Sequence, residues 1–270
     1  MAIDIQGLWD FEQPALSEAR FRAALADASA EERLILQTQI ARSYVLRGDL
    51  ARAMGILESM ADEIVAAGVE AQVRYELERG RAQASPTHPP ETLTWRALAE
   101  ARQAFERAFR RAKAAERDAL AIEALHGWAF TETDPQRQLD LEQDALRFIE
   151  HSSQETAQRW GCAIRIGIAQ ALIKLQRQDE AIAELQAAAL IGERLGATPC
   201  PHHARWLLGW IYRMMGRVHD ALELQLRLEQ AVSSPYLRRA VFDELERLYR
   251  ALSDDEQAHR YRAKALALSD

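Results

Sequence analysis

The sequence predicts an all-α protein in which helices follow one another as antiparallel pairs. Apolar residues recur at the i, i+3, i+4 and i+7 spacing of amphipathic helices along most of the 270 residues, and no segment alternates as a strand does. The 12 glycines and 8 prolines stand mainly between these segments, where such residues end helices. Because the turns are short, consecutive helices should be antiparallel neighbours. We expect about thirteen helices, most of them about 10 to 20 residues long.

Four helix starts can be read from capping residues. In a capping box, each of two side chains accepts a hydrogen bond from the backbone N–H of the other residue. A proline in the first helical turn loses nothing, because its missing N–H would have no partner there. The two predicted boxes are Ser29 with Glu32 and Ser253 with Glu256, and the two proline starts are Asp134-Pro135 and Ser234-Pro235.

The composition excludes several classes of function. With 28% charged residues and a net charge of −7, no global field draws the chain to phosphate backbones or anionic lipid. The opening MAIDIQGLWDFEQP has no basic stretch before an apolar one, and no later segment is long and apolar enough for a bilayer. Cys162 and Cys200 lie far apart in sequence and form no CxxC pair, which fits a reducing compartment and does not indicate a disulfide framework. We therefore expect a cytoplasmic protein that binds neither nucleic acid nor membrane.

Three stretches align without gaps, at residues 40–60, 168–188 and 208–228. Each has a small residue early in its first helix and an alanine in its second, where the two helices of a pair touch most closely. In this pattern the chain resembles the tetratricopeptide repeat (TPR) family, and its opening LWDFEQPALSEARF resembles that of bacterial proteins of this kind. The small residues that carry the resemblance are Ala41, Ala53, Ala169, Ala181, Gly209 and Ala221.

The resemblance implies a right-handed TPR-like solenoid of about six helix pairs in a single domain, 1–270. Residues 1–28 would cap the first repeat through Leu8, Trp9 and Phe11. An insert of about 16 residues near 81–98, with three prolines and His88, would interrupt the second repeat. The expected repeats are 31–67, 69–117, 119–150, 162–195, 202–233 and 239–270.

The resemblance also implies a binding face, because the first helices of TPR pairs line the concave surface. In the fifth repeat that register selects one helical stripe with two tryptophans and an arginine, residue types that carry much of the energy of interfaces. Polar residues of the neighbouring repeats would flank it. The predicted partner-binding residues are His203, Trp206, Trp210, Arg213, Met214, Gln170, Lys174, Asp243, Glu246 and Arg250.

Other readings of these surfaces stay open. Each tryptophan could pack against the next repeat with its indole N–H bonded locally, and the charges could form a solvated face. His126 and Trp128 are core residues or reach the same interior. The basic segment 96–117 is an exposed helix with paired charges, or it touches nucleic acid or an acidic partner. Because His202 and His203 project about 100° apart on a helix, they do not suit one metal ion. Only distant ligands could complete such a site: His126, His219 and Cys162.

No common catalytic motif is present, neither GxSxG, HExxH, GxxxxGK[ST] nor GxGxxG. The sequence therefore favours a non-catalytic scaffold, monomeric or homodimeric and without cofactor or metal, that binds a peptide or protein segment in the TPR groove. The alternative is a small-molecule site, possibly enzymatic, closed by the 81–98 insert acting as a lid. A third possibility is self-association through an end repeat.

Overall fold

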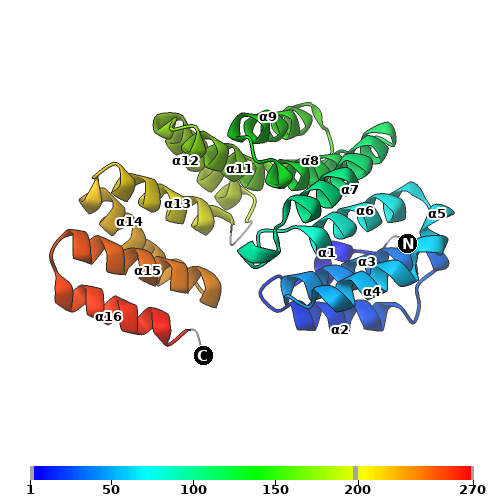
Figure 1. Cartoon of the computed structure of the whole chain (residues 1–270), viewed down its shortest axis with the longest axis horizontal. Helices are drawn as coiled ribbons and strands as arrows, with labels where there is room; N and C mark the ends of the chain where they lie inside the picture. Colours follow the sequence, from blue (N-terminus) through cyan, green and yellow to red (C-terminus); the bar gives the residue numbers. More distant parts are fainter. Residues whose placement is uncertain (1–2, 197–199, 269–270) are drawn as a thin grey trace. The chain divides into compact units, whose positions relative to one another are not determined.

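The computed structural model describes residues 3–196 and 200–268, and these residues form helices and turns without a strand (Figure 1). Their contacts divide the chain into two compact units, Met1–Gln158 and Arg159–Asp270. Each unit is built from antiparallel helix pairs, which confirms the predicted fold class. The single 1–270 domain remains a prediction. None of the described helices combines the length and the apolar character that a bilayer-spanning segment requires.

In unit 1 the pairs are α3 with α4, α6 with α7 and α8 with α9. We call the first helix of each pair its A helix and the second its B helix. The A helices α3, α6 and α8 contact one another in succession. The elements are α1 (Ile5–Leu8), α2 (Pro14–Ala24), α3 (Ala30–Leu46), α4 (Leu50–Ser59), α5 (Ala61–Val65), α6 (Val69–Gln83), the 3-10 turn η1 (Pro90–Thr92), α7 (Trp95–Ala114), α8 (Asp118–Thr131), α9 (Pro135–His151) and α10 (Glu155–Gln158).

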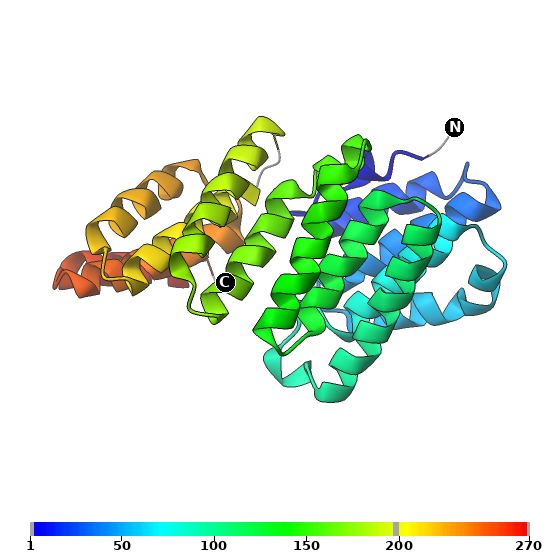
Figure 2. The same cartoon turned by 90° about the horizontal axis from the view of Figure 1, so that it is seen from above.

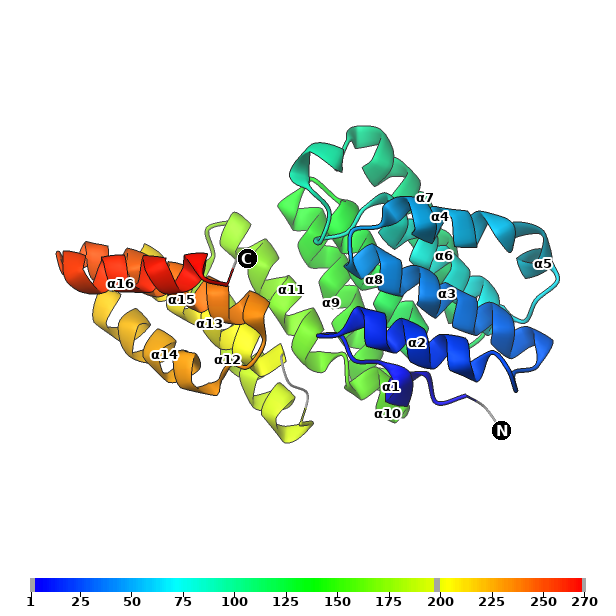
Figure 3. The same ribbon diagram turned by 90° about the horizontal axis from the view of Figure 1, so that it is seen from below.

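In unit 2 the pairs are α11 with α12, α13 with α14 and α15 with α16, and the A helices α11, α13 and α15 again contact in succession (Figure 3). The elements are α11 (Gly161–Lys174), α12 (Gln178–Arg194), α13 (Cys200–Met214), α14 (Val218–Ala231), α15 (Pro235–Ala251) and α16 (Asp255–Leu266).

Three of the four predicted helix starts are confirmed. Ser29 and Glu32 form a complete capping box, and the Asp134 side chain accepts a hydrogen bond from the backbone N–H of Gln136 at the start of α9. The prediction of a capping box formed by Ser253 and Glu256 is wrong. Ser253 has a φ of 59°, and Asp254 caps α16 instead by accepting from the N–H of Gln257. The chain needs one left-handed residue to turn from α15 into α16, so the cap moves one position on.

The core of unit 1 contains a close approach of three helices at Phe105 of α7. This ring is buried, and it occupies the space beside Gly80 of α6 and Gly127 of α8. A methyl group on Gly80 would lie 2.7 Å from Phe105 Cζ, and one on Gly127 would lie 2.5 Å from Phe105 Cε1. Helices α6, α7 and α8 (cyan to green in Figure 2) can therefore pack closely together because two glycines make room for one aromatic ring.

The predicted insert is shorter than expected, because α6 continues as a helix through Gln83. The connecting loop then runs from Ala84 to Thr94. Ala84, Ser85 and His88 are buried in it, and burial lowers the pKa of the His88 imidazole. The loop therefore packs against the unit at His88, whereas Trp95, at the start of α7, is 83% exposed.

The expectation that the two cysteines form no disulfide is wrong, because Cys162 and Cys200 are bonded to each other. The first turns of α11 and α13 meet although 38 positions separate the two residues, because consecutive A helices lie next to each other. Gly192 of α12 leaves room for this link, since a methyl group there would lie 3.2 Å from the Cys162 sulfur. Cysteine usage thus no longer indicates a reducing compartment.

The crowding at Phe105 predicts opposite effects for two glycine-to-alanine changes. Gly127→Ala should destabilise the protein by about 1–3 kcal/mol, because the added methyl displaces a buried ring. Gly55→Ala, in α4 with open space around it, should stabilise by about 0.5–1 kcal/mol through helix propensity. Urea denaturation of both variants measures the difference, and equal effects would show that the space beside Phe105 is not limiting.

Candidate functional site

The predicted stripe of the fifth repeat lies on α13, and some of its side chains form hydrogen bonds or ion pairs with α15. Trp206 donates its indole N–H to the carbonyl of Ala240 over 3.1 Å. His203 lies beside it with ring centroids 6.0 Å apart, and burial lowers the pKa of the imidazole. For Trp206 the contacts match the alternative in which the side chain packs against the next repeat.

Arg213 is also committed to α15. Its Nε donates to Glu244 Oε1 over 2.5 Å and a terminal nitrogen to Oε2 over 3.3 Å, while the Glu244 side chain is fully buried. Arg247 provides a second cation to Glu244 at 3.3 Å. A buried carboxylate needs such partners, so Arg213 connects two A helices rather than offering a free charge.

Trp210 and Met214 are the members of the stripe that remain available. Trp210 is half-buried, and its indole N–H donates no hydrogen bond within the residues that the structure describes. Met214, one helical turn later, is 61% exposed, and Met215 beside it is 42% exposed. A large apolar surface with one unused donor is what a partner chain could cover.

The flanking predicted residues lie on the other two A helices of unit 2. Gln170 and Lys174 are exposed on α11, and partial burial lowers the pKa of Lys174. On α15, Asp243 is partly buried, and Glu246 pairs with Arg250 over 2.7 Å. The A helices α11, α13 and α15 of unit 2 thus carry all ten predicted residues, with both signs of charge.

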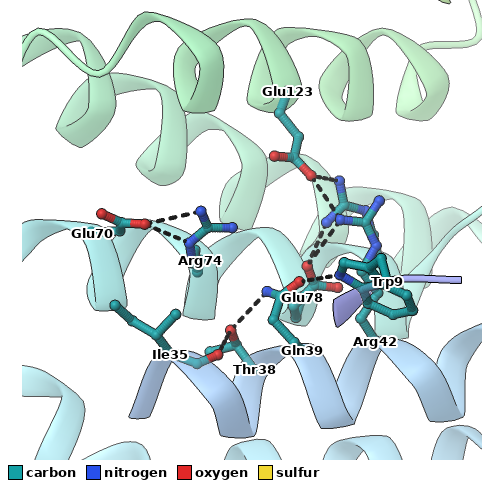
Figure 4. A network of polar contacts seen from close by, with 10 residues as sticks. Trp9, Ile35, Thr38, Gln39, Arg42, Glu70, Arg74, Glu78 and Glu123 are labelled. Carbon is teal, nitrogen blue, oxygen red and sulfur yellow. Dashed lines mark hydrogen bonds and ion pairs between the residues drawn. The ribbon is translucent and has the colours of Figure 1, made fainter. Parts of the chain in front are cut away.

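A second charged group, which the sequence analysis missed, lies on the A helices of unit 1. We call it the arginine–glutamate cluster: Arg42 of α3, Glu78 and Arg81 of α6, and Glu123 of α8 (Figure 4). Arg81 lies 2.5 Å from both carboxylates, and Arg42 lies 3.1 Å from Glu123 and 4.0 Å from Glu78. The cluster joins three A helices, including α3 to α8 across α6.

Burial raises the pKa of the two carboxylates, whereas the two arginines lower it. Burial raises the pKa of Glu123, but the attraction of Arg81 and Arg42 outweighs it and lowers the pKa to about 2. For Glu78 burial prevails over the same arginines and raises the pKa. One oxygen of Glu78, Oε2, is buried and has no hydrogen-bond partner among the residues that the structure describes. The cluster therefore contains an acceptor that its own residues leave unused.

His126 and Trp128 both lie on α8 of unit 1, and each has a polar partner within that unit. His126 Nδ1 lies 2.8 Å from Glu142, and Trp128 donates to Glu132. Burial lowers the pKa of His126, but the Glu142 carboxylate overcomes this and leaves it raised. The basic segment 96–117 lies largely on α7, where Arg107 pairs with Glu76 and Arg96 with Glu100.

One signal in the sequence could have located the arginine–glutamate cluster. Arg42 directly follows Ala41, the small residue of the first repeat, so the register that selected the unit 2 stripe also places Arg42 on an A-helix face. Nothing in the spacing of residues pairs Arg42 with Glu123, 81 positions later. Within the described residues, no group of three or more His, Cys, Asp or Glu side chains could hold a metal ion.

No protein-family model and no curated protein matches this chain. Among solved structures, the apo form of RapI is similar over 98% of this chain and 73% of its own, with a TM-score of 0.65 and 11% identity. A signal transduction ATPase with numerous domains and a tetratricopeptide repeat sensor, from Pyrococcus horikoshii, has a TM-score of 0.64 and 12% identity over 94% of this chain, which spans only 39% of that protein.

NprR in complex with its cognate peptide NprX is similar over 98% of this chain and 78% of its own, with a TM-score of 0.62 and 13% identity. At these identities the similarity establishes the fold of this chain and not its ligand.

The lowered pKa of Glu123 predicts acid sensitivity. Because the folded state holds this carboxylate charged, the unfolded state binds more protons between about pH 2 and 4.5. The stability that Glu123 contributes is thus present above pH 4.5 and is lost as the pH falls toward 2, on the order of 3 kcal/mol in all. Glu123→Gln should flatten the pH dependence of urea unfolding in this window, whereas Glu223→Gln, at an exposed pair, should not. Parallel curves for Glu123→Gln and wild type would contradict the assignment.

Because Arg213 pairs with the buried carboxylate of Glu244, its removal should lower the free energy of unfolding. Arg213→Ala leaves the buried Glu244 with Arg247 alone and should destabilise the protein by about 2–4 kcal/mol. Arg250→Ala, which breaks an exposed pair with Glu246, should cost less than about 1 kcal/mol. Chemical denaturation compares the two, and similar losses would mean that Arg213 is free to bind a partner.

Proposed function

We propose that this chain, which has the TPR-like repeat fold, is a non-catalytic scaffold that binds a peptide or protein segment on the A-helix face of unit 2. The single observation that carries the proposal is the exposed surface of Trp210 and Met214, surrounded by residues that α13 and α15 hold in place. The fold it shares with NprR, a protein whose structure holds its cognate peptide, supports the same class of ligand.

The predicted residues then have two different tasks. Trp206 and Arg213 fix α13 against α15 through Ala240 and Glu244, so they shape the face without contacting the ligand as free groups. Trp210 and Met214 supply the apolar contact, and their exposure gives them area to bury. Gln170, Lys174, Asp243, Glu246 and Arg250 form a polar rim of both signs, which suits a polypeptide better than a uniformly charged polymer.

The alternative of a small-molecule site under the insert has less support. A lid residue must present its side chain to the site it closes, whereas His88 is 94% buried against its own unit.

Monomer and homodimer both remain compatible with the proposal. A cytoplasmic location also stays part of it, although the Cys162–Cys200 disulfide weighs against that location because cytoplasmic reductants keep most thiols reduced.

The proposal predicts that Trp210→Ala with Met214→Ala loses the partner while the fold persists. Truncating an interface tryptophan costs about 2 kcal/mol or more, so binding should weaken at least about tenfold. Quantitative pull-down from a lysate of the source organism compares this variant with wild type. Once a protein is lost only from the variant, calorimetry with that purified protein measures the loss in affinity.

Two variants serve as matched controls. Trp95→Ala removes an exposed tryptophan from unit 1, and Leu190→Ala removes an exposed apolar side chain from the B helix α12. Both should retain the wild-type set of captured proteins. If the double variant also retains every protein that wild type captures, the face around Trp210 is not the binding site.

A further inference from the structure

A cavity of about 360 Å³ opens in unit 2 among its last three helices, α14, α15 and α16 (Figure 1). Its walls are the last turn of α14, the first half of α15 and the end of α16 with the residues just after it. Helix α15 packs against both of the other helices. A volume of this size is typical of sites for small molecules.

One wall of the cavity is fixed by polar contacts between α14 and α16. Lys264 donates to Glu229 Oε1 over 2.6 Å, and the Tyr261 hydroxyl donates to Oε2 of the same carboxylate over 2.8 Å. Burial and this hydrogen bond both raise the pKa of Tyr261, so the hydroxyl keeps its proton. The Lys264 ammonium also lies 5.3 Å from the ring centroid of Phe242. Within this wall, the charges of Lys264 and Glu229 offset each other.

Arg238 of α15 adds a positive charge to the cavity that no neighbour balances. Its side chain is exposed, and its guanidinium has no hydrogen-bond or ion-pair partner among the residues that the structure describes. Phe242, one helical turn later on the same face of α15, and Leu268 provide apolar walls beside it. With two cations and one carboxylate, the cavity carries one net positive charge next to an apolar surface.

We infer that this cavity binds a small monocarboxylic acid with an apolar body. The planar guanidinium of Arg238 matches the two oxygens of a carboxylate, and Phe242 and Leu268 receive the apolar part. The carboxylate of Glu229 in the same cavity disfavours a ligand with two negative charges. The cavity shares no lining residue with the ten predicted residues of the Trp210 face, so the inference does not depend on the function proposed above.

Phenylacetate and hexanoate are suitable probes, one with an aromatic body and one with an aliphatic body. Each is titrated into the isotope-labelled full chain, and two-dimensional NMR follows the backbone amide signals. The largest shifts should occur at the residues that line the cavity, such as Phe242 and Leu268. Phenylacetamide, which is neutral, and acetate, which has no apolar body, should both bind at least about tenfold more weakly than phenylacetate. These comparisons leave the protein unchanged.

Two neighbouring arginines give a matched pair of variants. Arg238→Gln should weaken the binding of phenylacetate at least about tenfold, because it removes the cation that faces the carboxylate. Arg239→Gln changes an exposed arginine that does not line the cavity, so the affinity should stay within about twofold of wild type. Because Arg238 is exposed and unpaired, its variant should fold as wild type does.

Four results would overturn the inference. Neither acid shifts the signals of the cavity residues, phenylacetamide binds as tightly as phenylacetate, or the two arginine variants bind phenylacetate equally. The fourth is a phenyl phosphate affinity equal to that of phenylacetate, since Glu229 should repel the second negative charge of this dianion.

Discussion

The close contact between the two helices of each pair is the constraint on which the rest of the structure depends. In all three repeats that align without gaps, each helix of the pair buries an alanine or glycine, for example Ala41 and Ala53, or Gly209 and Ala221. A larger side chain there would separate the helices of a pair. Because the two helices of each pair lie close together, the A helices of successive pairs can contact one another. The side chains on the free face of these A helices then share a surface.

Charged side chains then connect the A helices in both units. In unit 1 the arginine–glutamate cluster links α3, α6 and α8, and in unit 2 Arg213 links α13 to the buried Glu244 of α15. These contacts cost desolvation, and their geometry compensates for it. Arg42 has two contacts of different kinds, because it pairs with Glu123 of α8 and also lies over the ring of Trp9.

The helix pairs could be predicted from the sequence because their small residues follow a local period. Which side chains become buried or bonded between neighbouring helices follows no such period. The stripe on α13 was found, yet its spacing could not tell that Trp206 and Arg213 are engaged by α15 while Trp210 is not. The Cys162–Cys200 disulfide and the arginine–glutamate cluster were missed for the same reason, since each joins residues of different repeats. The misplaced cap at Ser253 depended on a single backbone angle.

The disulfide of unit 2 also determines how this part of the chain responds to mechanical force. Cys162 and Cys200 are covalently joined across 38 positions, so tension on the two ends of the unit bypasses everything between them. At about 3.4 Å per residue, roughly 130 Å of contour length is withheld from extension. Pulling can unravel α13 to α16, but α12 and the part of α11 after Cys162 stay within a closed loop. The unit therefore has a mechanically protected part, formed by α11 and α12, and an extensible part from α13 onward.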